Sequence, residues 1–258
     1  MPRFSANISM LFGEVEFPDR FEAAARAGFE AVEMQFPYAW DKRRLAQAAR
    51  RAGVEVVLIN IPAGDPRKGD RGIACLPDRV AEFREGVARA IDYAGALGCG
   101  RMNGLAGIAP PGADHSALRR TYVSNLRYAA NELARAGMTL LIEPISTHSV
   151  PGFFLNRSAD ALALIEEAGT GNLKVQYDLY HMHVMGDDLA ATIAANLGSI
   201  AHMQVADAPG RHEPGSGEID FPPLFDLIDR LGYQGWIGAE YTPAGNTLDG
   251  LAWAKEYL

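Results

Sequence analysis

The 258-residue sequence is poor in residues that build disulfide frameworks and zinc sites, with two cysteines and six histidines. Cys75 and Cys99 form neither a cysteine metal motif nor a disulfide framework. A single disulfide between them is the alternative. A reduced chain is the simpler interpretation, because persistent disulfides belong mainly to oxidising compartments. We therefore predict a cytoplasmic protein.

The sequence also lacks an excess of positive charge. Its formal net charge is −8, from 24 Lys and Arg against 32 Asp and Glu. Nucleic-acid binding depends largely on Lys and Arg contacts to phosphates, so no nucleic-acid partner is expected. A small anionic substrate held by a local basic cluster remains compatible with this balance.

Long apolar runs are missing as well. The first residues, 1–12, have no basic segment followed by a long apolar core, so no signal peptide is predicted. No apolar stretch reaches the length that crosses a bilayer, and no membrane partner is expected.

One pattern recurs along the whole chain: an Ala-, Arg- and Leu-rich helical segment, a Gly turn, and a short apolar run. Residues 49–60 (ARRAGVEVVLIN) and 195–207 (ANLGSIAHMQVAD) are examples. Gly is favoured just past a helix end, and short continuous apolar runs are typical of parallel strands buried on both faces. With an opening strand near 4–8, the pattern gives eight strands.

Eight such units predict an α/β protein with one (β/α)8 barrel over residues 1–258. No linker or composition break divides the chain. The alternative is an open doubly wound sheet, which is less favoured because no Gly-rich dinucleotide fingerprint follows the first strand. The clearest amphipathic helix covers 117–136, and Asp187 and Asp188 are suited to start the helix that follows them.

Polar residues end four consecutive predicted strands. They are Glu143, Asp178, Gln204 and Glu240. Since the carboxyl ends of barrel strands meet at one mouth, these side chains are expected to converge. Any one of them alone is also explained by a helix cap, a salt bridge or a loop hydrogen bond, but the set of four favours a site.

Three carboxylates in one mouth repel each other and raise one another's pKa unless a cation lies among them. Oxygen donors favour Mg²⁺ or Mn²⁺ over Zn²⁺. A softer metal is the alternative, because His181 and His202 are close enough in the sequence to supply imidazole ligands. We therefore predict a divalent metal site, most simply Mg²⁺ or Mn²⁺.

Basic residues on the same face are candidates for substrate binding. Arg211 is a cation in the long loop after the seventh strand, and its alternative is a loop salt bridge. Arg67, Lys68 and Arg71 lie in a Gly- and Pro-rich loop that is expected to close over a substrate carboxylate, or else to be solvated.

Two neutral residues complete the predicted substrate-binding set. Asn60 ends the third strand and is suited to bind hydroxyl groups. His181 follows Asp178 by three residues and is either a substrate hydrogen-bonder or a structural loop residue.

A metal on the adjacent oxygens of an α-hydroxy carbonyl compound acts as a Lewis acid and stabilises an enediolate. Glu143 and Glu240 are the natural pair to remove and return the protons. The predicted reaction is aldose–ketose isomerisation or epimerisation, and a direct hydride shift stays open as the route.

Several motifs resemble the hydroxypyruvate isomerase family within the xylose isomerase-like TIM-barrel superfamily. They run from end to end of the chain: FSANISMLF at 4–12, INIPAGD at 59–65, LIEPI at 141–145, QYDLYHM at 176–182, QVADAPGRHEPGSGEID at 204–220 and GAEY at 238–241.

The resemblance implies interconversion of hydroxypyruvate and 2-hydroxy-3-oxopropanoate (tartronate semialdehyde). It implies Glu143 and Glu240 as the acid–base pair, with Asp178 and Gln204 joining them in the metal set. Ketose 3-epimerases of the superfamily usually have His where this chain has Gln204. The 2-oxo-tetronate isomerases are equally similar and act on a four-carbon acid, so both substrates stay open.

Two other classes remain as alternatives. An AP endonuclease-like DNA repair enzyme needs a His-rich zinc site and a basic face, which six histidines and a net charge of −8 disfavour. A catalytically dead sugar-acid binding protein is disfavoured by the presence of both Glu143 and Glu240. The sequence leaves a homo-oligomer open.

Overall fold

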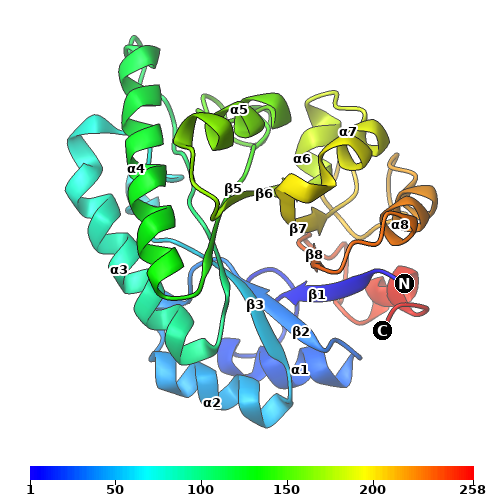
Figure 1. Ribbon diagram of the computed structural model, residues 1–258. Helices are drawn as coiled ribbons and strands as arrows, with labels where there is room; N and C mark the ends of the chain where they lie inside the picture. Colours follow the sequence, from blue (N-terminus) through cyan, green and yellow to red (C-terminus); the bar gives the residue numbers. More distant parts are fainter.

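The computed structural model describes all 258 residues, and eight parallel strands form a closed barrel in sequence order. The strands are β1 (Arg3–Asn7), β2 (Ala31–Met34), β3 (Glu55–Asn60), β4 (Arg101–Asn103), β5 (Thr139–Ile142), β6 (Leu173–Asp178), β7 (Ile200–Val205) and β8 (Trp236–Ala239). Pairing of β1 with β8 closes the barrel, and helices surround it (Figure 1). The predicted (β/α)8 barrel is confirmed.

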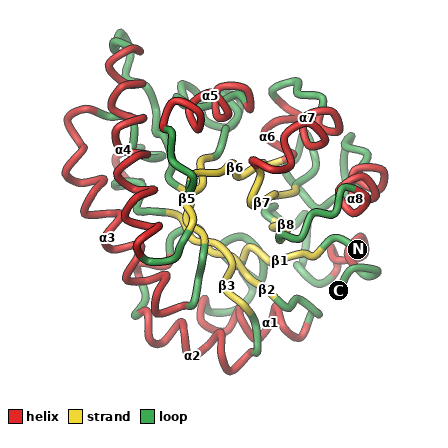
Figure 2. Tube along the Cα trace, viewed as in Figure 1, coloured by secondary structure: helices red, strands yellow, loops and turns green.

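The α-helices lie in the connections between the strands (Figure 2). They are α1 (Arg20–Arg26), α2 (Lys42–Ala52), α3 (Val80–Leu97), α4 (His115–Arg135), α5 (Ser158–Ala168), α6 (Leu179–Val184), α7 (Leu189–Asn196) and α8 (Phe221–Arg230). The last βα unit differs from the prediction, because a short 3-10 segment, Asp249–Ala254, takes the place of a helix after β8.

Local sequence signals explain where several helices begin and end. Asp41 starts α2 by accepting hydrogen bonds from the backbone N–H groups of Arg43 and Arg44. Gly53 ends α2 with φ of +74°, a conformation that residues with a side chain rarely adopt. Asp188 starts α7 by accepting from the N–H of Ala191, as predicted, whereas Asp187 faces the Tyr177 hydroxyl.

The barrel interior changes character along its length. One end is apolar, where Ala31, Val57 and Trp236 form a small buried cluster. Further toward the strand carboxyl ends, buried polar side chains replace it, and they include Ser5, Glu33, Asn103, Gln176, His202 and Gln204. Buried polar groups are costly unless they are hydrogen-bonded, so the side chains in this half of the interior need partners among one another. No helix combines the length and the apolar character that a membrane span requires.

Aromatic packing fastens the 3-10 segment after β8 to the first strand. The ring of Phe4 lies 5.1 Å from that of Phe225, 5.0 Å from Trp253 and 5.2 Å from Tyr257, measured between centroids. Phe4 itself is 2% exposed. Both ends of the chain therefore share one aromatic cluster with α8.

Replacement of this ring provides a test of the packing. Phe4→Ala is expected to lower the free energy of unfolding by about 3–5 kcal/mol, because it leaves a cavity among three aromatic rings. Urea unfolding monitored by tryptophan fluorescence measures the change. Leu248→Ala is the control, since Leu248 is 61% exposed and should change stability by less than about 0.5 kcal/mol. A comparable loss in both variants would contradict the special role of Phe4.

Candidate active site at the carboxyl ends of the strands

A cavity of about 620 Å³ opens at the carboxyl ends of the strands. Its wall includes most of the predicted site residues: Asn60, Arg71, Glu143, His181, Arg211 and Glu240. In a barrel of this type, catalytic groups come from the ends of several strands and the loops that follow them. The cavity therefore unites residues that are up to 205 positions apart in the sequence, from Gln35 to Glu240.

Three buried side chains in this region are arranged like metal ligands. Glu143, Asp178 and His181 each place one ligand atom within 4.8 Å of the other two. His181 joins the carboxylates because α6 begins directly after β6. Asp178 Oδ1 accepts the N–H of Tyr180 at 2.8 Å and so starts that helix.

The second oxygen of Asp178 fits a cation. Oδ2 is buried and has no hydrogen-bond partner, and the Nδ1 atom of His181 is also unpartnered. A buried anionic oxygen is costly unless a charge or a donor compensates it. Two carboxylates and an imidazole are common ligands of divalent metal ions, so the residues present fit a divalent cation.

Burial shifts the ionisation of this cluster. It raises the pKa of Glu143 well above its usual value, and the charges of Glu240 and Asp178 add to that effect. Burial also lowers the pKa of His181 to about 4, so its imidazole is neutral at pH 7. The pocket thus disfavours net negative charge in the absence of a cation.

Glu240 is held from three sides. Oε1 accepts from Asn7 Nδ2 and from Gln35 Nε2, both at 2.9 Å. Oε2 accepts from Arg211 Nη2 at 2.6 Å. Burial raises the pKa of Glu240 to about 7, although Arg211 opposes the shift. A carboxyl with a pKa close to neutral is suited to both giving and taking a proton.

Glu143 has a freer environment than Glu240. Its Oε2 accepts from Asn103 Nδ2 at 2.7 Å, and no hydrogen bond reaches Oε1. The two predicted catalytic carboxylates thus face one cavity with different partners. One oxygen of Glu143 has no hydrogen-bond partner, whereas both oxygens of Glu240 are engaged.

Arg211 is presented by a loop with a fixed shape. The carboxylate of Asp207 accepts four backbone N–H groups across this loop, at distances from 2.8 to 3.0 Å; the donors are Ala208, Gly215, Gly217 and Ile219. Arg211 has φ of +54°, and its guanidinium also lies 3.6 Å from Asp178 Oδ2. The predicted cation therefore bridges two carboxylates of the site.

Gln204 lies beside Asp178 in the register of β6 and β7. Its Nε2 donates to Glu33 Oε1 at 2.7 Å, and its Oε1 accepts from Gln176 Nε2 at 2.6 Å. Gln204 therefore belongs to a hydrogen-bonded layer inside the barrel. A carbonyl oxygen has two lone pairs, so Oε1 keeps the capacity to bind a further partner.

The predicted basic loop is divided. Arg71 lines the cavity, whereas Arg67 has an 88% exposed side chain and pairs with Asp65 at 3.0 Å. Lys68 is also exposed and does not line the cavity.

Several residues of this face were not predicted from the sequence. Asn7, Glu33 and Gln35 contact the site or the layer beneath it. Arg89, from α3, also lines the cavity. A usable signal existed for Glu33, because it interrupts the apolar strand AVEM without any turn residue nearby.

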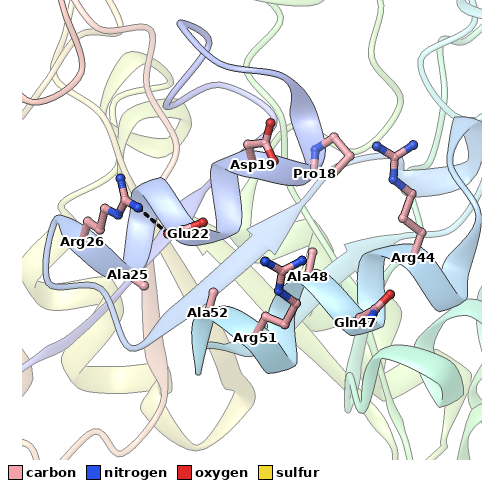
Figure 3. A pocket seen from close by; sticks show the side chains of 10 residues that line it. All are labelled: Pro18, Asp19, Glu22, Ala25, Arg26, Arg44, Gln47, Ala48, Arg51 and Ala52. Carbon is pink, nitrogen blue, oxygen red and sulfur yellow. Dashed lines mark hydrogen bonds and ion pairs between the residues drawn. The ribbon is translucent and has the colours of Figure 1, made fainter.

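A second hollow, of about 540 Å³, lies outside the barrel between α1 and α2 (Figure 3). Its charged lining includes Arg26, Arg44 and Arg51, and Arg26 pairs with Glu22. None of the residues from the strand ends reaches it. The chemistry is therefore assigned to the cavity at the barrel mouth.

Known proteins resemble this chain over its whole length. A hydroxypyruvate isomerase from Escherichia coli is 49% identical over 257 residues, covering 100% of both chains. A 2-oxo-tetronate isomerase from Cupriavidus necator is 47% identical over 258 residues, covering 100% of this chain and 99% of that protein. The resemblance inferred from the motifs and the prediction of an isomerase are confirmed.

Solved structures agree with the barrel. The crystal structure of a protein described as AP endonuclease, family 2, from Brucella melitensis has a TM-score of 0.97 and 43% identity, covering 100% of this chain and 99% of that one. A 3-keto-D-glucoside 4-epimerase from Escherichia coli has a TM-score of 0.78 at 21% identity, covers 99% of both chains, and shares the fold. A family model described as xylose isomerase-like TIM barrel matches residues 21–257, so the chain belongs to the xylose isomerase-like TIM-barrel family.

Proposed function

We propose that this isomerase interconverts hydroxypyruvate and 2-hydroxy-3-oxopropanoate by acid–base chemistry between Glu143 and Glu240. The observation that carries the proposal is the pair of buried carboxylates facing one cavity in different environments. The names of the relatives from Escherichia coli and Cupriavidus necator support a small hydroxy-oxo acid as the substrate.

The reaction moves one hydrogen between adjacent carbons. A carboxylate removes a proton from C3 of hydroxypyruvate, and the bonding electrons form an enediolate. Return of a proton to C2, with transfer of the O3 proton to O2, gives the product aldehyde. Glu143 Oε1 is the freer oxygen and is suited to the proton at carbon. Glu240, which Arg211 and Asn7 hold in place, is suited to the exchange on the opposite carbon. A hydride shift between the carbons is the alternative route.

A divalent cation belongs to this proposal, with Mg²⁺ or Mn²⁺ as the ion. Glu143, Asp178, Gln204 and Glu240 form its proposed ligand set, and the position of His181 adds an imidazole to the candidates. When bound, the ion would supply Lewis acidity toward adjacent substrate oxygens. The orphaned Asp178 Oδ2 supports this assignment.

Cations in the cavity wall are proposed to hold the substrate carboxylate. Arg211 lies at the carboxylate pair, and Arg71 and Asn60 lie elsewhere on the wall. Arg67 and Lys68 do not line the cavity, and we propose that they approach the bound acid only when their loop closes over it. The buried, unpaired cysteines are consistent with the proposed cytoplasmic role in sugar-acid metabolism.

A second candidate substrate is 2-oxo-tetronate, which carries an extra CH₂OH group beyond the reacting carbons. The cavity of about 620 Å³ is far larger than a three-carbon acid requires, so it also has room for the four-carbon acid as a candidate substrate. The same carboxylates would move the same hydrogen in both cases.

Glu143→Gln and Glu240→Gln should each reduce kcat at least about a hundredfold, because each loses a group that transfers protons. Steady-state kinetics on hydroxypyruvate measures the loss. Glu218→Gln is the matched control, since Glu218 is an exposed carboxylate in a loop of the same face and should keep normal turnover. Near-normal kcat in either site variant would remove that residue from the mechanism.

Removal of the cation should abolish turnover. Exhaustive chelation is expected to reduce activity to background, and added Mg²⁺ or Mn²⁺ should restore it, whereas Asp178→Asn should not be restored at the same ion concentration. Full activity in chelated protein, with no response to added ions, would contradict the metal assignment.

Substrate choice is tested by measuring kcat/KM on hydroxypyruvate and on 2-oxo-tetronate side by side. We expect kcat/KM to be at least about tenfold higher for the three-carbon acid than for the four-carbon acid. The reverse preference would keep the residues and the chemistry while assigning the enzyme to the four-carbon acid. Lack of turnover on both acids would contradict the proposed function.

A further inference from the structure

Glu33 is a buried carboxylate that does not line the active-site cavity. It lies on β2 inside the barrel, and four side chains donate to it. Ser5 and His202 reach Oε2 at 3.0 and 2.7 Å. Asn7 and Gln204 reach Oε1 at 3.0 and 2.7 Å. An ionised carboxylate only accepts hydrogen bonds, so each of these neighbours must turn a donor toward it.

Asn7 connects this carboxylate to Glu240. Its single amide nitrogen lies 3.0 Å from Glu33 Oε1 and 2.9 Å from Glu240 Oε1. The two hydrogens of the amide group therefore serve two different carboxylates. Asn7 Oδ1 is also occupied, because it accepts the N–H of Ser9 at 3.1 Å. Glu33 thereby helps to fix the position of one oxygen of Glu240.

Gln204 is oriented in the same way. Because Glu33 accepts only, Gln204 must place Nε2 against it, and Oε1 then lies at the other end of the amide. Rotation of the amide by half a turn would present nitrogen, which has no lone pair free for a cation. The charge on Glu33 thus determines which atom of Gln204 is available to the site.

The backbone of β8 is shaped around the same carboxylate. A Cβ atom on Gly238 would lie 2.2 and 2.4 Å from the two oxygens of Glu33. Gly238 pairs with Ser5 on one side and with Gln204 on the other. The glycine of the GAEY segment therefore leaves the space in which Glu33 sits.

We propose that Glu33 is a positioning residue that orients Gln204 directly and Glu240 through Asn7, so that the site offers fixed oxygen atoms to cation and substrate. The inference rests on the proposed function and adds to it a residue that lies beneath the cavity. Groups that hold a metal ligand in place typically change metal affinity about 10- to 100-fold when they are replaced.

Glu33→Gln provides the test. Gln keeps the side-chain shape but replaces one accepting oxygen with an NH₂ donor, which then faces the donors that surround this position. Mn²⁺ affinity, measured directly by titration calorimetry, should weaken at least about tenfold, and kcat should fall at least about tenfold. Circular dichroism and thermal unfolding establish that the variant is folded.

A double-mutant cycle separates positioning from a merely structural role. If Glu33 acts on the cation through Gln204, Glu33→Gln should cause little further loss of Mn²⁺ affinity in a Gln204→Ala background. Equal fold-losses in both backgrounds would overturn that part of the proposal. An Asn7→Ala background tests the connection to Glu240 in the same way, with kcat as the readout.

Ser5→Ala is the control. Ser5 donates to the same carboxylate but bonds no residue of the cavity, so Mn²⁺ affinity and kcat should stay within about twofold of the wild type. If Glu33→Gln does not fold, Glu33→Asp keeps the charge and withdraws it by one methylene, and the same losses are expected.

The possible failures are distinguishable. Folded Glu33 variants with wild-type Mn²⁺ affinity and turnover would overturn the role of Glu33 alone. Wild-type protein that neither binds Mn²⁺ nor isomerises either acid would contradict the proposed function and, with it, this inference.

Discussion

The structure depends on keeping several carboxylates inside a barrel that excludes bulk water. Glu33, Glu143, Asp178 and Glu240 are all at most 5% exposed. A buried carboxylate is tolerated only with donors, a counter-charge or a bound proton. Glu33 has four donors and stays ionised, because His202 and its hydrogen bonds outweigh the effect of burial and lower its pKa. Glu143, Asp178 and Glu240 have fewer side-chain donors than Glu33.

The number of hydrogen-bond donors differs among these buried carboxylates. Glu33 is saturated, Glu240 is engaged at both oxygens, Glu143 has one donor, and Asp178 has one oxygen with none. Each missing partner is a vacancy that a cation or a substrate can fill with energetic gain. Catalytic groups of such barrels lie at the carboxyl ends of the strands, which agrees with the position of the proposed site.

The fold was predictable because its signals are local and repeated. Seven apolar runs, each preceded by a helix and a turn, identify the barrel together with the opening strand, and parallel strands place Glu143, Asp178 and Glu240 at one mouth. His181 was predicted as a substrate-binding residue or a donor to a softer metal, and it lies beside two of these carboxylates because α6 begins directly after β6. The 3-10 segment after β8 was also missed, since aromatic packing against Phe4 rather than a long amphipathic repeat holds it.

The basic loop after β3 shows a different limit. Three cations lie within five residues, yet only Arg71 reaches the cavity, because Asp65 draws Arg67 outward. Loop composition indicates charge but not the direction of each side chain. Glu33 was overlooked for a related reason: a single charged residue in an apolar strand has no partner in the local sequence, and its donors come from β1 and β7.

Asp178 combines two duties in one side chain: Oδ1 starts α6, and Oδ2 lies without a hydrogen bond, 3.6 Å from the guanidinium of Arg211. Asparagine at this position would retain the cap, because Asn is as good an N-cap as Asp, and would remove the buried charge. Helix capping alone therefore does not require a carboxylate at this position. The second oxygen is thus the part of this side chain that capping leaves free for the proposed cation.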